Sequence, residues 1–285
     1  MSDLLRLIYP QWQGGNRIQY AAGTRLLEWL SPDSGCETVE IPVSMDPEQD
    51  HIRDGIAYKD TLLSQTHNTL SILKEKCPGH LVVFGGECSV SLAPFSYMLE
   101  KYPGDTGILW FDRHADISIA GETTDYHAMV VTSLLGEGDP DFRSFVPDKI
   151  SPDRLLYVGV NDAEQFQRKV CPKFKLKNIP PEDFARDSSA VMEAVRGMNV
   201  RNLLIHFDLD VIDLSIFRSQ SSANPDVYFE RLKKIRPGAS FESLIRVLND
   251  IDSEFEIRCI SVAEYLPWDI MNLKHLLANM PLVNR

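Results

Sequence analysis

The feature that most constrains the fold is a series of short, continuously apolar segments separated by longer segments with helical periodicity. The apolar segments are rich in Val, Ile and Leu without strict alternation, which is typical of strands buried on both faces. We expect strands at Leu4–Tyr9, Thr38–Val43, His80–Phe84, Thr106–Phe111, Leu155–Val160, Leu203–Phe207 and Cys259–Ala263. This alternation predicts an α/β fold with three αβα layers and a mainly parallel sheet.

The expected helices have recognisable ends. Ile52–Lys76 carries apolar residues at helical spacing and is followed by a Cys-Pro-Gly sequence that ends helices. Phe241–Ile251 and Ile270–Met280 are amphipathic, with Ser240 and Asp269 as the expected N-caps. No boundary signal interrupts the alternation, so we expect a single domain over residues 1–285.

Charge and composition exclude several classes of partner. The net charge of −12 argues against nucleic acid, because neutralising phosphates requires clustered Lys and Arg. The sequence has no run of ~20 apolar residues that would span a membrane, and its first residues lack the pattern of a secretory signal. The five cysteines are odd in number and show no CxxC spacing, which favours a reducing, cytoplasmic location.

Four aspartates, a histidine, a cysteine and a glutamate near the C-terminus follow four of the predicted strands. They are Cys88, Asp112, His114, Asp116, Asp208, Asp210 and Glu264. The carboxyl ends of parallel strands meet at one edge of a sheet, where α/β proteins place their sites. In an extended chain, the spacing of Asp112, His114 and Asp116 also points all three side chains to one side.

Four converging aspartates cannot all stay ionised without a counter-charge. Divalent cations supply that charge, and a mostly oxygen set with one imidazole suits Mn²⁺ better than copper. Two such ions can activate a shared water as a nucleophile. Either acidic pattern alone is common in loops, but the two together favour a metal site. Taken alone, Cys88 fits a buried structural cysteine equally well, and Glu264 fits a helix cap or a solvent-facing carboxylate.

At these residues the chain resembles the ureohydrolase family, which includes arginase, agmatinase and formiminoglutamase. The family motifs GGDHS, DAHxD, SxDxDxxDP, HGxPxSxLLG and a late glutamate have counterparts here. The corresponding segments are Gly85–Ser89, Asp112–Asp116, His206–Leu214, His127–Gly136 and Ala263–Tyr265.

The resemblance implies a binuclear centre with two divalent ions, Mn²⁺ above all. One ion would be held by Cys88, Asp112, Asp116 and Asp208. The other would be held by Asp112, His114, Asp208 and Asp210. The implied reaction is hydrolysis of a C–N bond in a guanidino, amidine or formimino compound such as arginine, N-hydroxyarginine or agmatine. The family also implies that copies of the chain associate into homo-oligomers.

The resemblance assigns roles to the remaining groups. Glu264 would bind the cationic end of the substrate, Asp116 would accept a proton from the attacking water, and His127 would pass a proton to the leaving amine. Ser118 and Glu164 stand where arginases contact the rest of the substrate, although Ser118 replaces an asparagine and the segment around Glu164 matches only loosely.

The chain also departs from the family motifs. Cys88 replaces a ligand histidine, which makes the set softer and more anionic. Arg113 replaces alanine and Glu87 replaces aspartate, and we predict an ion pair between them. The segment Ile216–Gly238 is longer and more polar than its family counterpart.

Two other interpretations are open. The chain could be a catalytically weakened or inactive arginase-like protein that acts as a binding module, with Cys88 marking a damaged site. It could also be a zinc deacetylase, which shares the expected sheet. That group uses an adjacent His-His pair, and this sequence has none.

Overall fold

The computed structural model describes residues 3–47, 52–161 and 174–280. Its centre is an eight-stranded sheet in the order β2-β1-β3-β8-β7-β4-β5-β6, and all neighbouring strands pair in parallel. The strands are β1 (Leu4–Tyr9), β2 (Glu37–Glu40), β3 (His80–Gly85), β4 (Thr106–Phe111), β5 (Leu155–Val158), β6 (Lys177–Ile179), β7 (Asn202–Asp208) and β8 (Glu256–Ala263). The predicted parallel α/β fold is confirmed.

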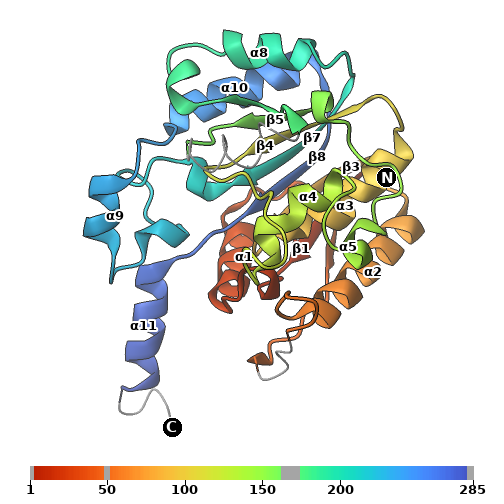
Figure 1. The fold of residues 1–285 in the computed structure, drawn as a ribbon. Helices are drawn as coiled ribbons and strands as arrows, with labels where there is room; N and C mark the ends of the chain where they lie inside the picture. The colour runs from red at the N-terminus through yellow and green to blue at the C-terminus, as the bar shows by residue number, and fades with distance from the viewer. Residues whose placement is uncertain (1–2, 48–51, 162–173, 281–285) are drawn as a thin grey trace.

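Helices cover both faces of the sheet (Figure 1). One face carries α1 (Gln19–Leu30), α2 (Lys59–Lys76), α3 (Leu92–Lys101), α4 (Val130–Leu134) and α5 (Pro140–Arg143). The other face carries α8 (Ser189–Arg196) and α10 (Phe241–Glu254). Each face has its own apolar core, and consecutive strand residues alternate between the two. Trp110 and Leu204 belong to the first core, and Phe111 and Ile205 belong to the second.

The ends of some elements differ from the sequence predictions. β2 ends at Glu40 instead of Val43, and α2 begins at Lys59 instead of Ile52. Ser240 caps α10 as predicted, because its hydroxyl accepts a hydrogen bond from the Ser243 backbone at 3.1 Å. Asp269 is not an N-cap: it lies inside the first turn of α11 (Trp268–Ala278).

Two helices lie away from the sheet. α9 (Tyr228–Lys234) belongs to the polar segment after β7, and α11 projects from the body of the molecule (Figure 1). Among the described residues, no helix combines the length and the apolar character needed to cross a membrane.

The strand order brings four loops together. β3, β8, β7 and β4 are consecutive neighbours, so the segments that leave their carboxyl ends lie side by side. The turn after β3 packs tightly against the segment that follows β1. A Cβ on Gly86 would lie 1.8 Å from the carbonyl oxygen of Gln11, so only glycine allows this approach. This close packing fixes the position of the next two residues, Glu87 and Cys88.

Candidate metal centre

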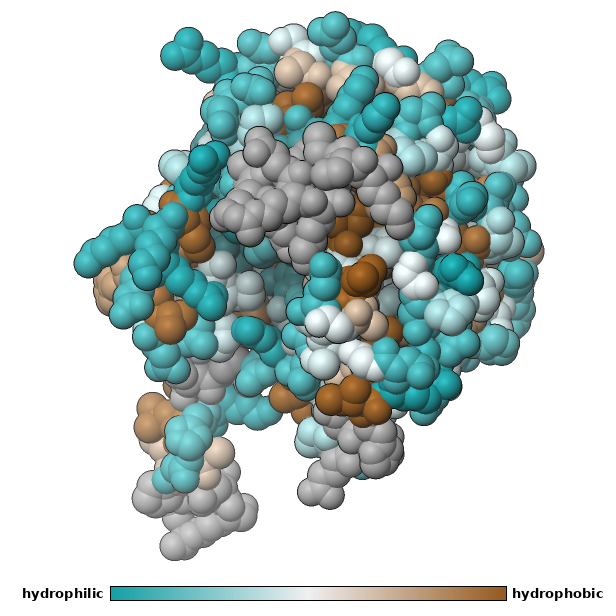
Figure 2. Space-filling model, in the orientation of Figure 1, coloured by the Kyte–Doolittle hydropathy of each residue, from teal (hydrophilic) through white to brown (hydrophobic). Residues whose placement is uncertain are grey.

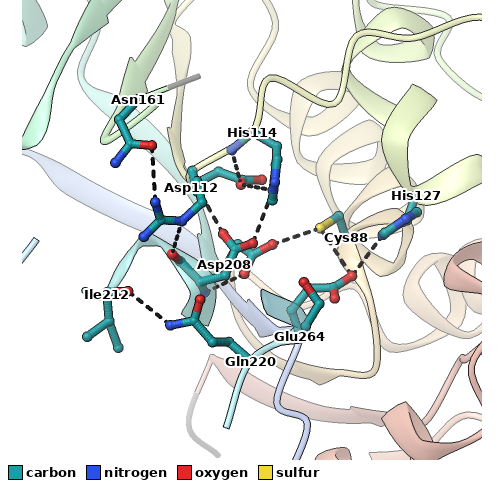
Figure 3. Close-up of polar contacts among 12 residues, drawn as sticks. Cys88, Asp112, His114, His127, Asn161, Asp208, Ile212, Gln220 and Glu264 are labelled. Atoms are coloured by element: carbon teal, nitrogen blue, oxygen red, sulfur yellow. Dashed lines mark hydrogen bonds and ion pairs between the residues drawn. The ribbon is translucent and has the colours of Figure 1, made fainter. Parts of the chain in front are cut away.

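The four loops deliver their polar side chains to one buried cluster (Figure 3). Cys88 begins a short 3₁₀ turn after β3, and Asp112 directly follows β4. Asp208 is the last residue of β7, and Glu264 directly follows β8. All four residues are at most 3% exposed. The structure therefore brings together groups that are up to 176 residues apart in the sequence.

One set of potential ligands consists of Asp112, His114, Asp208 and Asp210. Each offers one ligand atom, and these atoms all lie within 4.8 Å of one another. Backbone groups orient two of the carboxylates. The Asp112 carboxylate accepts a hydrogen bond from the His114 N–H at 2.6 Å, and the Asp208 carboxylate accepts one from the Asp210 N–H at 2.6 Å. These four residues are the ones that the sequence assigned to the second ion.

A second set consists of Cys88, Asp112, Asp116 and His206, whose potential ligand atoms also lie within 4.8 Å of one another. Asp208 is close by, with Oδ2 3.3 Å from the Cys88 sulfur. The sequence analysis did not assign His206 to the site. The signal was present: His206 precedes Asp208 by two residues on the same strand, so both side chains leave the same face.

Burial and mutual repulsion act on these carboxylates. Burial, followed by the charges of Asp210 and Asp112, raises the pKa of Asp208 well above its ordinary value. Burial and the charge of Asp112 do the same for the pKa of Asp116. Burial opposes ionisation of Asp210 as well, but the nearby His114 outweighs it and lowers the pKa of Asp210. Such a cluster favours binding of cations, because a divalent ion removes the repulsion.

A third group joins the first two beside the cluster. His127 Nδ1 lies 2.9 Å from a Glu264 carboxylate oxygen, and both residues approach Cys88. Burial opposes the positive charge of His127, but Glu264 outweighs it and raises the pKa of His127 to about 10. Asp116 and Glu264 have left-handed backbone conformations, with φ of 47° and 68°. Strained conformations of this kind concentrate at functional sites.

A cavity of about 440 Å³ opens onto this group. Figure 2 shows a hollow near the middle of this face of the molecule. His114, Asp116 and His127 line the cavity together with Tyr20 and two arginines, Arg17 and Arg231. The segment after β1 contributes Gly15. The cluster is therefore accessible to a small molecule from one side.

Two residues, Ser118 and Glu164, were expected to contact the substrate. Ser118 is buried, its N–H donates to the Ala128 carbonyl at 2.8 Å, and its own carbonyl accepts from Thr132 Oγ1. It is not among the described residues that line the cavity. Glu164 lies outside the described residues.

The predicted ion pair between Arg113 and Glu87 is wrong. The Arg113 side chain donates to the Asp210 carbonyl at 3.2 Å, to Asn161 Oδ1 at 3.2 Å and to the Arg236 carbonyl at 3.1 Å. Glu87 accepts from the Ser89 N–H and hydroxyl, both at 2.8 Å. Arg113 stands between Asp112 and His114, so its side chain points away from theirs and towards the loop before α10.

Two buried atoms of the cluster show that it fits metal ions. Among the described residues, Asp116 Oδ2 and His206 Nε2 are buried without a hydrogen-bond partner. Buried polar atoms are rarely left unpaired, and both residues belong to the second ligand set, where a bound ion could supply the missing partner. Carboxylate, imidazole and thiolate groups are also the donors that divalent metals prefer. Fold and site together define an α/β protein with a buried, carboxylate-rich cluster at the carboxyl edge of its sheet that could hold metal ions.

Comparison with known proteins places this chain in a family. Residues 34–225 match the model of the arginase family. The arginase of Eremothecium gossypii is 25% identical over 142 residues, which cover 46% of this chain and 35% of that protein. The arginase of Saccharomyces cerevisiae is 32% identical over 96 residues, covering 31% and 28%. The chain thus spans only about a third of these relatives' length.

The structural likeness extends further along the chain. A crystal structure of Entamoeba histolytica arginase in complex with L-ornithine superposes with a TM-score of 0.78 at 18% identity, covering 93% of this chain and 90% of that one. At this identity the superposition supports the fold. Because the family model matches more than half of its length, the chain belongs to the arginase family.

Proposed function

We propose that this protein is a metal-dependent amidinohydrolase that cleaves a C–N bond of a guanidino or formimino compound. The observation that carries the proposal is the pair of ligand sets that share Asp112, each with its donor atoms within 4.8 Å of one another. We propose that the first ion is held by Cys88, Asp112, Asp116 and Asp208, and the second by Asp112, His114, Asp208 and Asp210. Mn²⁺ is the ion to try first for this oxygen-rich set.

Two ions bound here would supply an activated water and positive charge that stabilises an anionic transition state. The protein groups around them perform the remaining tasks. The Glu264 carboxylate, now paired with His127 at 2.9 Å, would bind the guanidinium of the substrate. The unpaired Asp116 Oδ2 would accept a proton from the attacking water. Because Glu264 raises the pKa of His127 to about 10, His127 carries a proton at neutral pH before the substrate binds, and it could donate this proton to the leaving amine once Glu264 pairs with the substrate.

The cavity wall favours substrates with an anionic far end. Arg17 and Arg231 both line the cavity that leads to the cluster. A substrate that pairs its cationic group with Glu264 could place a carboxylate near these guanidiniums, whereas a diamine-like substrate such as agmatine would meet two positive charges. We therefore propose guanidino or formimino acids as the substrate class.

A screen of guanidino and formimino compounds, with several divalent metals, tests the activity. The products to measure are urea, hydroxyurea, formamide and ammonia, and Asp208→Asn is the control for contaminating activity. We expect turnover only by the wild type. If the wild type has bound metal but converts no compound faster than Asp208→Asn does, the chain is a binding module and the proposal fails.

The substrate class has its own test. Arg231→Gln should raise KM for compounds that carry a carboxylate and leave KM for agmatine-like compounds unchanged. The exposed Arg201, which lies at the opposite end of β7, provides a matched control as Arg201→Gln. Equal changes in KM for both kinds of compound would reject the role of Arg231.

We further propose that copies of the chain associate through α11. Ile270, Leu273, Leu276 and Leu277 of this projecting helix are 41–58% exposed and recur at helical spacing. A short helix with such an apolar stripe is marginal alone, so a second copy that packs against it would stabilise it. Sedimentation analysis of Leu273→Glu against the wild type tests this: equal masses would reject it.

The cysteines support a location in a reducing compartment such as the cytoplasm. Cys36, Cys77, Cys88 and Cys259 are free thiols in the described part of the chain, and Cys171 lies outside it. Free cysteines are normal where disulfides do not form. Microscopy of a fluorescently tagged chain in its own cells would test the location.

A further inference from the structure

His206 is a histidine of β7 that belongs to the buried cluster. It is fully buried in β7, where it lies in register with Trp110 of β4 and Ser261 of β8. The imidazole stacks on the Trp110 indole with the ring centroids 3.8 Å apart and the planes 21° apart. Packing from both neighbouring strands therefore fixes the plane of the ring.

The two ring nitrogens of His206 have different surroundings. Nδ1 lies 2.8 Å from the Ser91 hydroxyl and 3.2 Å from the Ser261 hydroxyl, and these hydroxyls contact each other at 2.7 Å. Nε2 is buried and has no partner among the described residues. A buried nitrogen without a partner destabilises the fold. Histidines that bind metals characteristically hold one nitrogen by a hydrogen bond and present the other to the ion.

His206 belongs to a set of donors that suits a soft or borderline ion. The ligand atoms of Cys88, Asp112, Asp116 and His206 lie within 4.8 Å of one another. Ligands at about 2.0–2.3 Å from an ion in tetrahedral arrangement are separated by about 3.3–3.8 Å. The donors therefore need to approach one another by only about an ångström, which side-chain rotation can supply.

We propose that His206 joins Cys88, Asp112, Asp116 and Asp208 at the first metal site, so that a thiolate from the loop after β3 and an imidazole from β7 act as ligands of the same ion. The proposal rests on the two-ion centre of the proposed function. In the motif that this segment resembles, serine stands at the position of His206 and histidine at the position of Cys88. The imidazole has thus moved from the loop after β3 to β7.

This ligand set predicts different metals at the two positions. A thiolate and an imidazole beside the carboxylates favour Zn²⁺ or Co²⁺ over Mn²⁺ at the first site. The second set, with three carboxylates and the single imidazole of His114, favours a harder ion. We expect the wild type to retain Zn²⁺ at the first site under dialysis that removes Mn²⁺.

The direct test is X-ray absorption spectroscopy of the intact wild-type protein loaded with one equivalent of Zn²⁺. We expect a sulfur ligand at about 2.3 Å and imidazole nitrogen at about 2.0–2.1 Å. A spectrum without sulfur overturns the proposal. With Co²⁺ in place of Zn²⁺, a thiolate charge-transfer band should appear in the wild type and be lost in Cys88→Ser.

Variants separate the role of His206 as a ligand from its role in packing. His206→Asn keeps a polar atom near the position of Nδ1 for the two serines but removes Nε2. Ser261→Ala disturbs the same buried hydrogen bonds and leaves Nε2 in place. We expect His206→Asn, which removes a ligand, to weaken Zn²⁺ binding by more than about 100-fold, and Ser261→Ala, which removes only a hydrogen bond to that ligand, to weaken it by about 10–100-fold. Equal Zn²⁺ affinity of His206→Asn and the wild type would overturn the proposal.

The double variant Cys88→His/His206→Ser provides the reverse test. It should bind two ions again and prefer Mn²⁺, whereas His206→Ser alone should lose one ion.

Metal content distinguishes this inference from the proposed function. If Zn²⁺ binds through sulfur and imidazole but no guanidino or formimino compound is hydrolysed, the inference holds and the proposed function fails. If hydrolysis occurs and His206→Asn keeps full metal affinity, the inference fails alone.

Discussion

Replacing Asp208 by asparagine should stabilise the metal-free protein although it destroys the metal site. Asp208 is 2% exposed, and its potential ligand oxygen lies within 4.8 Å of those of Asp112 and Asp210. Two like charges at this distance repel by about 3.5 kcal/mol at an effective dielectric constant of about 20. Partial protonation relieves some of this repulsion, because the pKa of Asp208 is already raised. We expect a net gain of about 1–3 kcal/mol.

The substitution preserves the local backbone contact. The side-chain oxygen of the introduced asparagine can still accept the Asp210 N–H bond, which is 2.6 Å long for Asp208. For a chain of this length, the expected gain raises Tm by roughly 2–5 °C in the presence of a chelator. Saturating divalent ions at about 100 times Kd should stabilise the wild type by about 2.7 kcal/mol for each bound ion and leave Asp208→Asn nearly unchanged. The order of the two proteins should therefore reverse when metal is added.

Differential scanning calorimetry with chelator and with Mn²⁺ or Zn²⁺ measures both effects. Asp252→Asn is the matched control, because Asp252 is exposed on α10 far from the cluster. It should show no stabilisation with chelator and the full response to metal. If Asp208→Asn is less stable than the wild type with chelator and gains as much from metal, the carboxylates are not a repulsive cation site.

Further predictions concern groups around the cluster. Burial raises the pKa of Glu87 from 4.5 to about 7, so the wild type should lose stability relative to Glu87→Gln as pH rises from 4.5 to 7; parallel urea-unfolding curves across this range would reject it. Glu264 raises the pKa of His127 from 6.5 to about 10. The stability from this pair should be full below pH 6.5 and lost as pH rises through about 10, and Glu264→Gln should abolish that dependence in thermal melts. Arg113→Ala should cost about 2–3 kcal/mol in urea unfolding, and Arg113→Lys should recover less than half of that.

Much of the sheet could be predicted because its central strands are buried on both faces. β1 and β4 begin and end where the apolar segments do. β6 was missed because its three residues, Lys177–Ile179, are polar or partly exposed at the edge of the sheet. No apolar segment marks such a strand, and only pairing with β5 defines it. Tertiary contacts decide elements of this kind.

The candidate site was predictable to the extent that strand geometry determines it. The acidic groups after β4 and β7 converge because parallel strands deliver their ends to one edge. The Arg113–Glu87 pair failed because neighbouring residues leave opposite sides of an extended chain. The partners of Arg113 lie between 48 and 123 residues away in the sequence. His206 was missed because a lone histidine within a strand resembles an ordinary core residue. Its unpaired nitrogen is visible only in three dimensions.

The most direct test of the central claim is the number of divalent ions that the purified chain binds. The protein should be stripped with chelator, incubated separately with Mn²⁺, Co²⁺, Fe²⁺ and Zn²⁺, dialysed and analysed by plasma mass spectrometry. We predict two ions per wild-type chain for at least one of these metals, and fewer than one ion per chain for Asp208→Asn. A wild type that retains no ion with any of these metals would show that the carboxylates after β4 and β7 do not form a metal centre.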